Sequence, residues 1–213
     1  TQAKTLFPYT TLFRSGLSDQ VTINGYFNQA ATQIEQFKFS DGVTWSVADI
    51  KTKAVFKGTS GNDTLVGTAA NDTFDGGAGT DTLRGGAGND TYKFGLGYGT
   101  DTIQDNDTTV GNVDVLQFLS GTTIDQLWFK QSGNHLEVSI IGTSDKAVIA
   151  DWYLGSQYHV EQFKTSDGKT LLDTQVQNLV NAMAGFAPPA AGQTTLPASY
   201  QPTLTPVITS NWQ

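Results

Sequence analysis

Four aspartates recur in this chain at a spacing of nine residues: Asp63, Asp72, Asp81 and Asp90. Each closes a short turn rich in small residues and is followed, two positions later, by a single large apolar residue. Carboxylate and backbone carbonyl oxygens are the ligands of calcium, a hard cation that takes about six to eight oxygens in a tolerant geometry. The spacing therefore predicts a row of calcium-binding turns.

These turns must be positioned by an element that repeats with the same period. From Gly58 to Lys93 the chain reads GTSGNDTLV, GTAANDTFD, GGAGTDTLR and GGAGNDTYK, four variants of one nine-residue unit. Glycine supplies the positive φ angles that aim several carbonyls at one point. The three residues after each aspartate alternate as a short strand does. The pattern is typical of a calcium-binding parallel β-helix.

Two units make one full turn of such a spiral, so residues eighteen positions apart should stack. This predicts Leu65 over Leu83 in one sheet and Phe74 over Tyr92 in the other. The same pairing brings the first and third turns together on one face, and the second and fourth turns together on the other. We therefore expect at least two calcium ions.

The charge of this segment indicates why metal is needed. Between Gly58 and Asp107 there are eight Asp and no Glu against Arg84 and Lys93, a balance of 2 − 8 = −6. One interior apolar residue per unit does not offset about 1–2 kcal/mol of backbone entropy per ordered residue. We expect the segment to be disordered without metal and to fold when calcium binds. The alternative is an ordinary solenoid whose Asn-Asp pairs cap turns, which does not explain four aspartates at one position.

The repeats resemble the RTX β-roll, the calcium-binding repeat of exported bacterial toxins, proteases, lipases and surface proteins. In that family the turn carbonyls and the aspartate hold the ion together with the turn two repeats on. The resemblance implies one ligand set from Gly58, Ser60, Asn62, Asp63, Gly77, Gly79 and Asp81, and a second from Gly67, Ala69, Asn71, Asp72, Gly86, Gly88, Asn89 and Asp90.

The chain departs from the family pattern at both ends of the repeats. Thr59, Thr68 and Ala70 replace glycines in the first two units, and Ala70 leaves the geometry of its turn open. After the fourth unit the interval between aspartates lengthens from nine to eleven residues. The spacing leaves open whether the half-turn that follows forms a third calcium site together with the Asp81 turn. Its candidate ligands are Gly97, Gly99 and Asp101.

A longer repeat surrounds the first. Residues 33–42 (QIEQFKFSDG) return as residues 159–168 (HVEQFKTSDG), an offset of 159 − 33 = 126. This unit resembles the haemolysin-type calcium-binding-related domain that often follows RTX repeats. Alternating residues at 127–129, 136–140 and 147–149 predict antiparallel strands. The aromatic residues of this unit are expected in the core: Trp128, Phe129, Trp152, Tyr153 and Phe163.

The C-terminal residues follow a different period. Apolar side chains at helical spacing predict a helix that starts at Asp173 or Thr174 and ends at Gly185; they are Val176, Leu179, Val180 and Met183. Five of the six prolines lie beyond it, so the tail is expected to be irregular. The family resemblance implies export by a one-step type I exporter that reads an uncleaved C-terminal signal, for which the tail is the candidate.

The predicted fold class is all-β: a parallel β-roll capped by antiparallel β segments, with a short C-terminal helix and an irregular tail. Residues 5–15 match the translation of a widely used sequencing adapter, so the natural protein is expected to differ there and to be longer. The expected divisions are 1–15 (artefactual or disordered leader), 16–57 (partial flanking β module), 58–107 (β-roll), 108–172 (flanking module that caps the roll) and 173–213 (helix and signal tail).

Composition narrows the function classes. A net charge of −8 and a pI near 4.5 argue against nucleic-acid binding. The chain has no Cys and therefore no disulfide framework. It contains no apolar run as long as a membrane span. These properties are those expected of an extracellular, secreted protein whose fold is held by metal.

No zinc-protease, nucleophile-elbow or phosphate-loop motif is present, and the two histidines, His135 and His159, fall in predicted strands far apart in sequence. We therefore expect a non-catalytic, calcium-binding C-terminal module of a larger type I-secreted RTX protein. One alternative is an adhesin or ice-binding solenoid that presents a threonine row. Another is a piece of a secreted hydrolase or toxin whose active part lies upstream. The threonines are Thr64, Thr73, Thr82, Thr91 and Thr102.

Overall fold

The computed structural model describes residues 9–13, 20–24, 36–38, 42, 44–46, 48–49 and 54–213. Over these residues the chain is mostly strand, and the strands of the repeats pair in parallel. Two α-helices follow at the C-terminal end. The greater part of the predicted N-terminal module, residues 16–57, lies outside the described residues.

Two sheets carry the repeats and the residues after them. The eight-stranded sheet contains, in spatial order, β16 (Thr170–Leu172), β15 (Gln162–Lys164), β11 (Val115–Phe118), β9 (Thr91–Phe94), β7 (Thr73–Asp75), β5 (Ala54–Lys57), β1 (Tyr9–Phe13) and β2 (Gln20–Asn24). The six-stranded sheet contains β12 (Leu127–Ser132), β13 (His135–Ile140), β14 (Lys146–Ile149), β10 (Thr100–Ile103), β8 (Thr82–Arg84) and β6 (Thr64–Val66). A separate pair is formed by β3 (Gln36–Lys38) and β4 (Thr44–Ser46).

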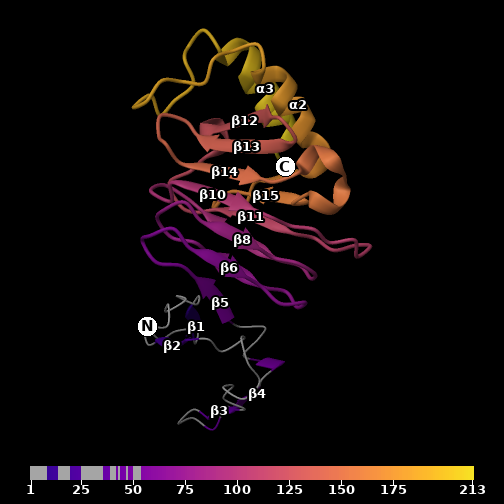
Figure 1. Ribbon diagram of the computed structural model, residues 1–213. Coiled ribbons are helices and arrows are strands. Elements are labelled where there is room, and N and C mark those ends of the chain that lie inside the picture. The colour runs from indigo at the N-terminus through magenta and orange to yellow at the C-terminus, as the bar shows by residue number, and fades with distance from the viewer. Residues whose placement is uncertain are drawn as a thin grey trace.

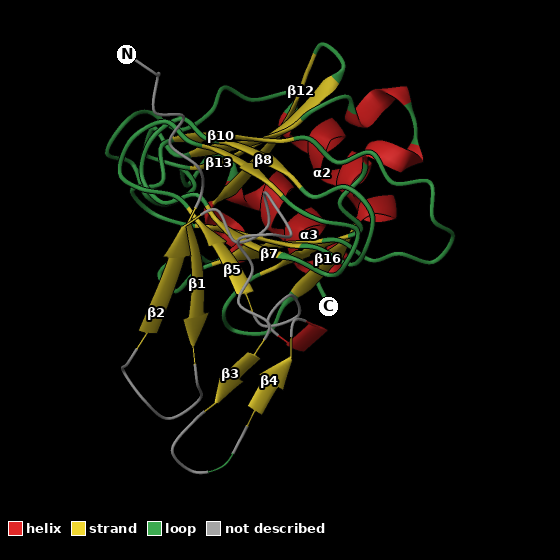
Figure 2. Cartoon of the chain, turned by 60° about the horizontal axis from the view of Figure 1, so that its bottom comes forward, coloured by secondary structure: helices red, strands yellow, loops and turns green. Residues whose placement is uncertain are grey.

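The repeats stack as their period predicts. β6 pairs in parallel with β8 and places Leu65 beside Leu83, while β7 pairs in parallel with β9 and places Phe74 beside Tyr92. The rings of Phe74 and Tyr92 are stacked with their centroids 5.2 Å apart. Phe56 of β5 extends this aromatic column at 5.1 Å from Phe74. Figure 2 shows the two sheets as opposed layers, so these side chains fill the space between them.

The stack continues where the sequence period fails. Ile103 of β10 pairs with Leu83, a separation of 103 − 83 = 20 residues. Leu116 of β11 pairs with Tyr92, a separation of 116 − 92 = 24 residues. The added residues lie in the connections between strands, so the interior positions remain aligned. The strands β14 and β15 then join β10 and β11 in parallel, and the two sheets run on through the downstream module.

The downstream end of each sheet turns antiparallel. The strands β12, β13 and β14 are antiparallel, as predicted for these residues, and β15 pairs with β16 in the same way. The predicted core aromatics Trp128, Phe129, Trp152 and Phe163 are buried, and Tyr153 packs half-buried against them. Figure 1 shows the strands stacked from β5 upward to β12, with both helices at the far end.

Helix α2 (Asp173–Met183) confirms the predicted helix and its apolar face. Its four buried residues are the four predicted ones: Val176, Leu179, Val180 and Met183. The Leu172 N–H donates to Gln175 Oε1 at 3.2 Å and holds the first turn. Met183 reaches β12, where its sulfur accepts the Phe129 N–H at 3.1 Å. The helix therefore covers the last strand of the six-stranded sheet.

The prediction of an irregular tail is wrong for its last part. Residues Gln201–Asn211 form helix α3, which packs against α2. Pro202 lies in the first turn, where no N–H is needed. Pro206 lies within the helix, but burial of Leu204 and Ile208 compensates for the one backbone bond lost. Gln213 then exchanges two backbone hydrogen bonds of 2.9 Å with Thr170 of β16.

Part of the predicted leader, residues 1–15, lies within the described structure. Tyr9–Phe13 form β1, which pairs antiparallel with β5 and with β2. A strand at that place satisfies the backbone groups that β5 would otherwise expose at the sheet edge. Because of helix α3, the chain is mostly β rather than all-β as predicted, and its C-terminal end carries two helices.

Candidate metal centre

Two rows of carboxylates run along the turns between the sheets. On one side the Asp63 N–H donates to Asp81 Oδ1 at 2.8 Å, and the Asp81 N–H donates to Asp101 Oδ1 at 3.1 Å. On the other side the Asp72 N–H donates to Asp90 Oδ1 at 2.8 Å. Each turn is thus tied to the next by one oxygen of an aspartate, and the predicted pairs of turns are brought together.

The second row extends beyond the predicted residues. The Asp90 N–H donates to Asp114 Oδ1 at 2.7 Å, and the Asp114 N–H donates to Glu161 Oε2 at 2.7 Å. Sequence reasoning missed Asp114 and Glu161, because their separations of 24 and 47 residues follow no period. Both keep one signal of the repeats, an apolar residue two positions later, namely Leu116 after Asp114 and Phe163 after Glu161.

The second oxygen of several aspartates has no partner among the described residues. Within that part of the chain, Oδ2 of Asp81, Asp90 and Asp101 is buried and accepts no hydrogen bond. These residues are between 0 and 1 % exposed. Buried carboxylate oxygens are rarely left without a donor, since such a group loses its water without compensation. Unpartnered anionic oxygens in a row of turns are the donor set that a hard cation uses, so these residues fit calcium.

The glycines of the third and fourth repeats make room for these oxygens. A Cβ atom on Gly76 would lie 2.5 Å from Asp81 Oδ2, so only glycine leaves the space beside that carboxylate open. The next two glycine positions have positive φ, as predicted: Gly77, Gly79, Gly86 and Gly88 at +86°, +141°, +91° and +119°. Gly79 also passes close to the preceding turn, since its Cβ would lie 2.6 Å from the Gly61 carbonyl oxygen.

The first two repeats close their turns differently. The Thr59 N–H and hydroxyl donate to Asp63 Oδ2 at 2.6 and 2.8 Å. The Thr68 N–H and hydroxyl donate to Asp72 Oδ2 at 2.6 and 3.0 Å. Ala70, which stands where the third glycine belongs, does not have a positive φ. In these two repeats threonine therefore donates hydrogen bonds to the aspartate Oδ2, the atom that remains without a donor in the later, glycine-containing repeats.

The asparagines and the turn tips play a structural part. Asn62 Oδ1 accepts the Thr80 N–H, and Asn71 Oδ1 accepts the Asn89 N–H, both at 2.9 Å. Asn89 Oδ1 in turn accepts the Val113 N–H at 3.1 Å. Gly58 and Gly67 join neighbouring strands through their N–H groups, while Ser60 and Ala69 are exposed. The side-chain amides thus link the turns, and the backbone carbonyls of these residues remain for a metal.

The half-turn after the fourth repeat joins the first row. Asp101 lies next to Asp81, and Gly79 and Gly99 form a parallel bridge. The N–H groups of Gly97 and Gly99 donate to Asp145 at 2.9 and 2.8 Å. Asp145 was not among the predicted site residues, because it lies 46 residues beyond Gly99.

Burial and like charge raise the pKa of these carboxyl groups. Burial raises the pKa of Asp90 to about 7, and the charge of Asp72 adds to the shift. Burial raises the pKa of Asp101 to about 7, with the charges of Asp81 and Asp145 in the same direction. Burial also raises the pKa of Asp114 to about 9, aided by Asp105 and Glu161. Without a counter-cation the folded state therefore favours the protonated acids.

Comparison with known families agrees with this geometry. Residues 57–92 match the RTX calcium-binding nonapeptide repeat in four copies. The chain carries RTX calcium-binding repeats. These repeats bind calcium ions, so the ligand predicted from the aspartate spacing is confirmed. Residues 15–49 and 135–175 match the haemolysin-type calcium binding protein related domain, which confirms the second resemblance and the duplication around the repeats.

One curated relative is the iron-regulated protein FrpA of Neisseria meningitidis serogroup C. It is 36 % identical over 87 residues, which are 39 % of this chain and 8 % of the relative. The chain therefore spans a small part of that protein's length. Within the described residues, none of the helices combines the length and the apolar character needed to cross a membrane.

The histidines do not join the carboxylate rows. His135 begins β13 and its Nδ1 accepts the Asp151 N–H at 2.9 Å. His159 lies outside the strands, contrary to prediction, because it is held against Trp152 with ring centroids 3.9 Å apart. Its Nδ1 is 3.1 Å from Asp173 Oδ2. Both contacts are structural links of the downstream module.

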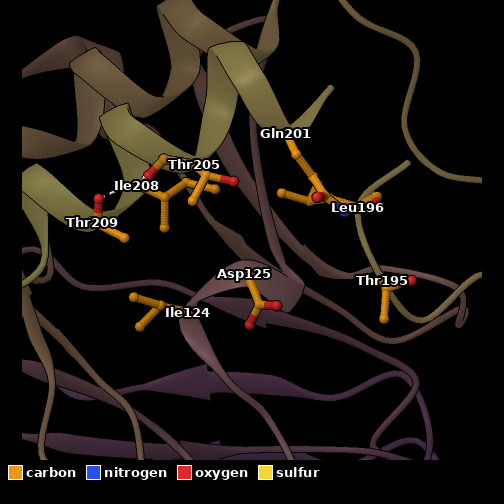
Figure 3. Close-up of a pocket in the computed structure, with 8 residues that line it drawn as sticks. All are labelled: Ile124, Asp125, Thr195, Leu196, Gln201, Thr205, Ile208 and Thr209. Carbon is orange, nitrogen blue, oxygen red and sulfur yellow. Dashed lines mark hydrogen bonds between the residues drawn. The ribbon is translucent and has the colours of Figure 1, made fainter. Parts of the chain in front are cut away.

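A pocket lies between α3 and the short helix η2 (Ile124–Gln126), and Figure 3 shows Ile124 and Asp125 across from Thr205, Ile208 and Thr209 of α3. Asp125 is the only acidic or basic side chain among its lining residues, so they provide no pair of groups for acid–base chemistry. The lining residues are Ile124, Asp125, Thr195, Leu196, Gln201, Thr205, Ile208 and Thr209. The carboxylate rows remain the candidate functional site.

Proposed function

We propose that residues 58–107 form a calcium-binding β-roll in the C-terminal part of a larger exported bacterial protein, and that the roll folds when it meets calcium outside the cell. The observation that carries the proposal is the row of buried, unpartnered oxygens on Asp81, Asp90 and Asp101. A calcium ion supplies the positive charge these carboxylates lack in the protein. The binding free energy then contributes directly to folding.

We assign the strongest sites to the third and fourth turns. Asp81 and Asp101 supply carboxylate oxygens on one side, and Asp90 on the other. Carbonyl groups of the positive-φ glycines around them complete the donor set. The first and second turns are weaker partners, because Thr59 and Thr68 already donate to Asp63 and Asp72. The remaining predicted ligands contribute backbone carbonyls.

The assignment is tested by counting bound calcium in equilibrium dialysis at pH 7.5. Asp81→Asn retains the acceptor for the Asp63 N–H but removes one charge, and it should lose one ion or weaken it at least tenfold. Asp151→Asn is the matched control, since Asp151 has a left-handed φ of 58° that asparagine tolerates. It should bind as many ions as the wild type. Absence of calcium binding by the wild type at millimolar concentration would contradict the proposal.

We also propose that a type I exporter recognises the C-terminal tail as a signal and exports the chain. In the folded chain, helix α3 is docked with Leu204 and Ile208 buried. An exporter that reads the tail therefore requires the unfolded chain, before calcium binds. Deletion of the tail, residues 188–213, should stop secretion in a host with such an exporter. Leu204→Ala, which weakens docking but keeps the tail, should still be secreted. Unchanged secretion of the deletion would refute the signal.

The threonine row gives little support to an ice-binding or adhesive surface. Thr64, Thr82 and Thr102 are aligned along the six-stranded sheet. Of the five threonines predicted to form the row, only Thr64 is exposed. A flat binding surface needs side chains that face solvent together, so the calcium-binding reading is preferred.

A further inference from the structure

Three aspartates from separate parts of the chain meet at the downstream end of the repeats. One carboxylate oxygen of each of Asp90, Asp105 and Asp114 lies within 4.8 Å of the others. Asp90 ends the turn before β9, Asp105 follows β10, and Asp114 precedes β11. Asp90 and Asp114 thus belong to the eight-stranded sheet, while Asp105 comes from the end of a strand in the other sheet.

All three side chains are almost completely buried. Asp90 and Asp114 are 0 % exposed and Asp105 is 2 % exposed. In the part of the chain that the structure describes, none of them forms an ion pair with Lys, Arg or His. Three buried carboxylates without a positive charge are strongly unfavourable. The cluster therefore requires either protons or a cation.

Two of the oxygens are open, whereas the others are held in place. Asp90 Oδ2 and Asp105 Oδ1 are buried and have no hydrogen-bond partner among the residues that the structure describes. The Tyr92 hydroxyl donates to Asp105 Oδ2 at 3.0 Å, and Asn112 Nδ2 donates to Asp114 Oδ2 at 3.0 Å. Neutral donors orient the carboxylates without cancelling their charge. This arrangement leaves two anionic oxygens for a ligand that carries positive charge.

We propose that Asp90, Asp105 and Asp114 form a further calcium site, outside the nonapeptide pattern. It differs from the sites between the repeats because Asp105 occupies no repeat position and adds a third carboxylate to the row. Carboxylate oxygens alone suit a hard divalent cation, and a flexible ligand number favours calcium. The inference rests on the proposed calcium-dependent fold, which supplies the metal and the neighbouring turns.

The site would join the repeats to the downstream module. Asp90 belongs to the last repeat, whereas the Asp114 N–H is bound by Glu161 of the downstream module. A cation held between them fixes β11 against β9 at the point where the sequence period ends. The expected consequence is that the downstream module docks only when this ion is bound.

The test is a count of calcium ions for the wild type, Asp105→Asn and Asp151→Asn, by equilibrium dialysis and by native mass spectrometry. Asp105→Asn keeps the shape and an acceptor for the Tyr92 hydroxyl but removes the charge. It should bind one ion fewer than the wild type and the control. In calcium the melting midpoint of Asp105→Asn should be lower than that of the wild type. Without metal, the β content of Asp105→Asn should be no lower than that of the wild type, because the substitution removes repulsion; a purely structural role would lower both quantities.

A second variant keeps the test decisive if Asp105→Asn does not fold in calcium. Tyr92→Phe leaves all three carboxylates but removes the hydroxyl that orients Asp105, so it should weaken one ion by about 2- to 10-fold and leave the others unchanged. An unchanged ion count in a folded Asp105→Asn, or unchanged affinities in Tyr92→Phe, would overturn this site alone. A wild type that binds no calcium would overturn the proposed function as well.

Discussion

Acidification should restore structure to the metal-free protein. An aspartate whose pKa is raised in the folded state binds its proton more tightly there than in the unfolded chain. Its contribution to stability is present below the unfolded pKa and is lost as the pH rises through the folded pKa. For Asp90 and Asp101 that window runs from the ordinary value of 3.8 to about 7. The metal-free fold should therefore be more stable at pH 5.5 than at pH 7.5.

The size of the effect is worked for Asp90 and Asp101; the raised pKa of Asp114 acts in the same direction. One pKa unit corresponds to about 1.36 kcal/mol, so the interval from pH 5.5 to pH 7 gives about 2 kcal/mol for each group, or about 4 kcal/mol for both. The effective dielectric constant even at buried sites is well above that of dry protein, and we expect about half of that, roughly 2 kcal/mol. This is about a 30-fold change in the ratio of folded to unfolded chains.

The assay is far-ultraviolet circular dichroism of metal-stripped protein at the two pH values, with sedimentation to exclude aggregation near the pI of about 4.5. Asp90→Asn mimics the protonated acid, so its metal-free β content should depend less on pH than that of the wild type. Asp151→Asn changes net charge equally and should behave as the wild type. Equal β content of the wild type at both pH values, or the same pH response in Asp90→Asn, would refute the reasoning.

Two further predictions concern stability in calcium, measured as the free energy of unfolding in urea. Gly79→Ala should lower the free energy of unfolding by about 1–3 kcal/mol, because Gly79 has a φ of +141° and lies against the Gly61 carbonyl. The control is Gly61→Ala, at the same repeat position without a positive φ, which should leave the free energy of unfolding unchanged. Similar losses in both would show that the turn conformation is not as described. Leu204→Ala should cost about 2–5 kcal/mol, since Leu204 is 0 % exposed, whereas the exposed Thr203→Ala should have little effect. No loss in Leu204→Ala would mean that α3 is not docked.

The periodic part of the molecule was predictable from sequence. A nine-residue repeat with one apolar residue per unit fixes both the strand spacing and the side chain that faces inward. Leu65 therefore had to pair with Leu83, as it does. The same holds for α2, whose apolar residues recur at 3.6-residue spacing and are buried.

The remainder depends on contacts that no period encodes. Asp105, Asp114 and Asp145 reach the carboxylate rows through connections of irregular length, so spacing alone did not identify them. Threonine replaced glycine in two turns, and only the side-chain geometry shows that its hydroxyl binds the aspartate. Helix α3 contains Pro202 and Pro206, and local propensity argued against it. Burial against α2 outweighed that propensity, which a single sequence does not reveal.

The central claim is that calcium folds the repeats, and a titration of the metal-free chain at pH 7.5 tests it most directly. Circular dichroism should gain β signal in a sigmoidal manner between about 0.01 and 10 mM calcium, since extracellular calcium modules bind at about 10⁻⁴–10⁻³ M. Trp emission should shift over the same range as Trp128 and Trp152 become buried. Magnesium, which demands a stricter octahedral geometry, should produce neither change. Equal β content in chelator and in calcium would contradict the account.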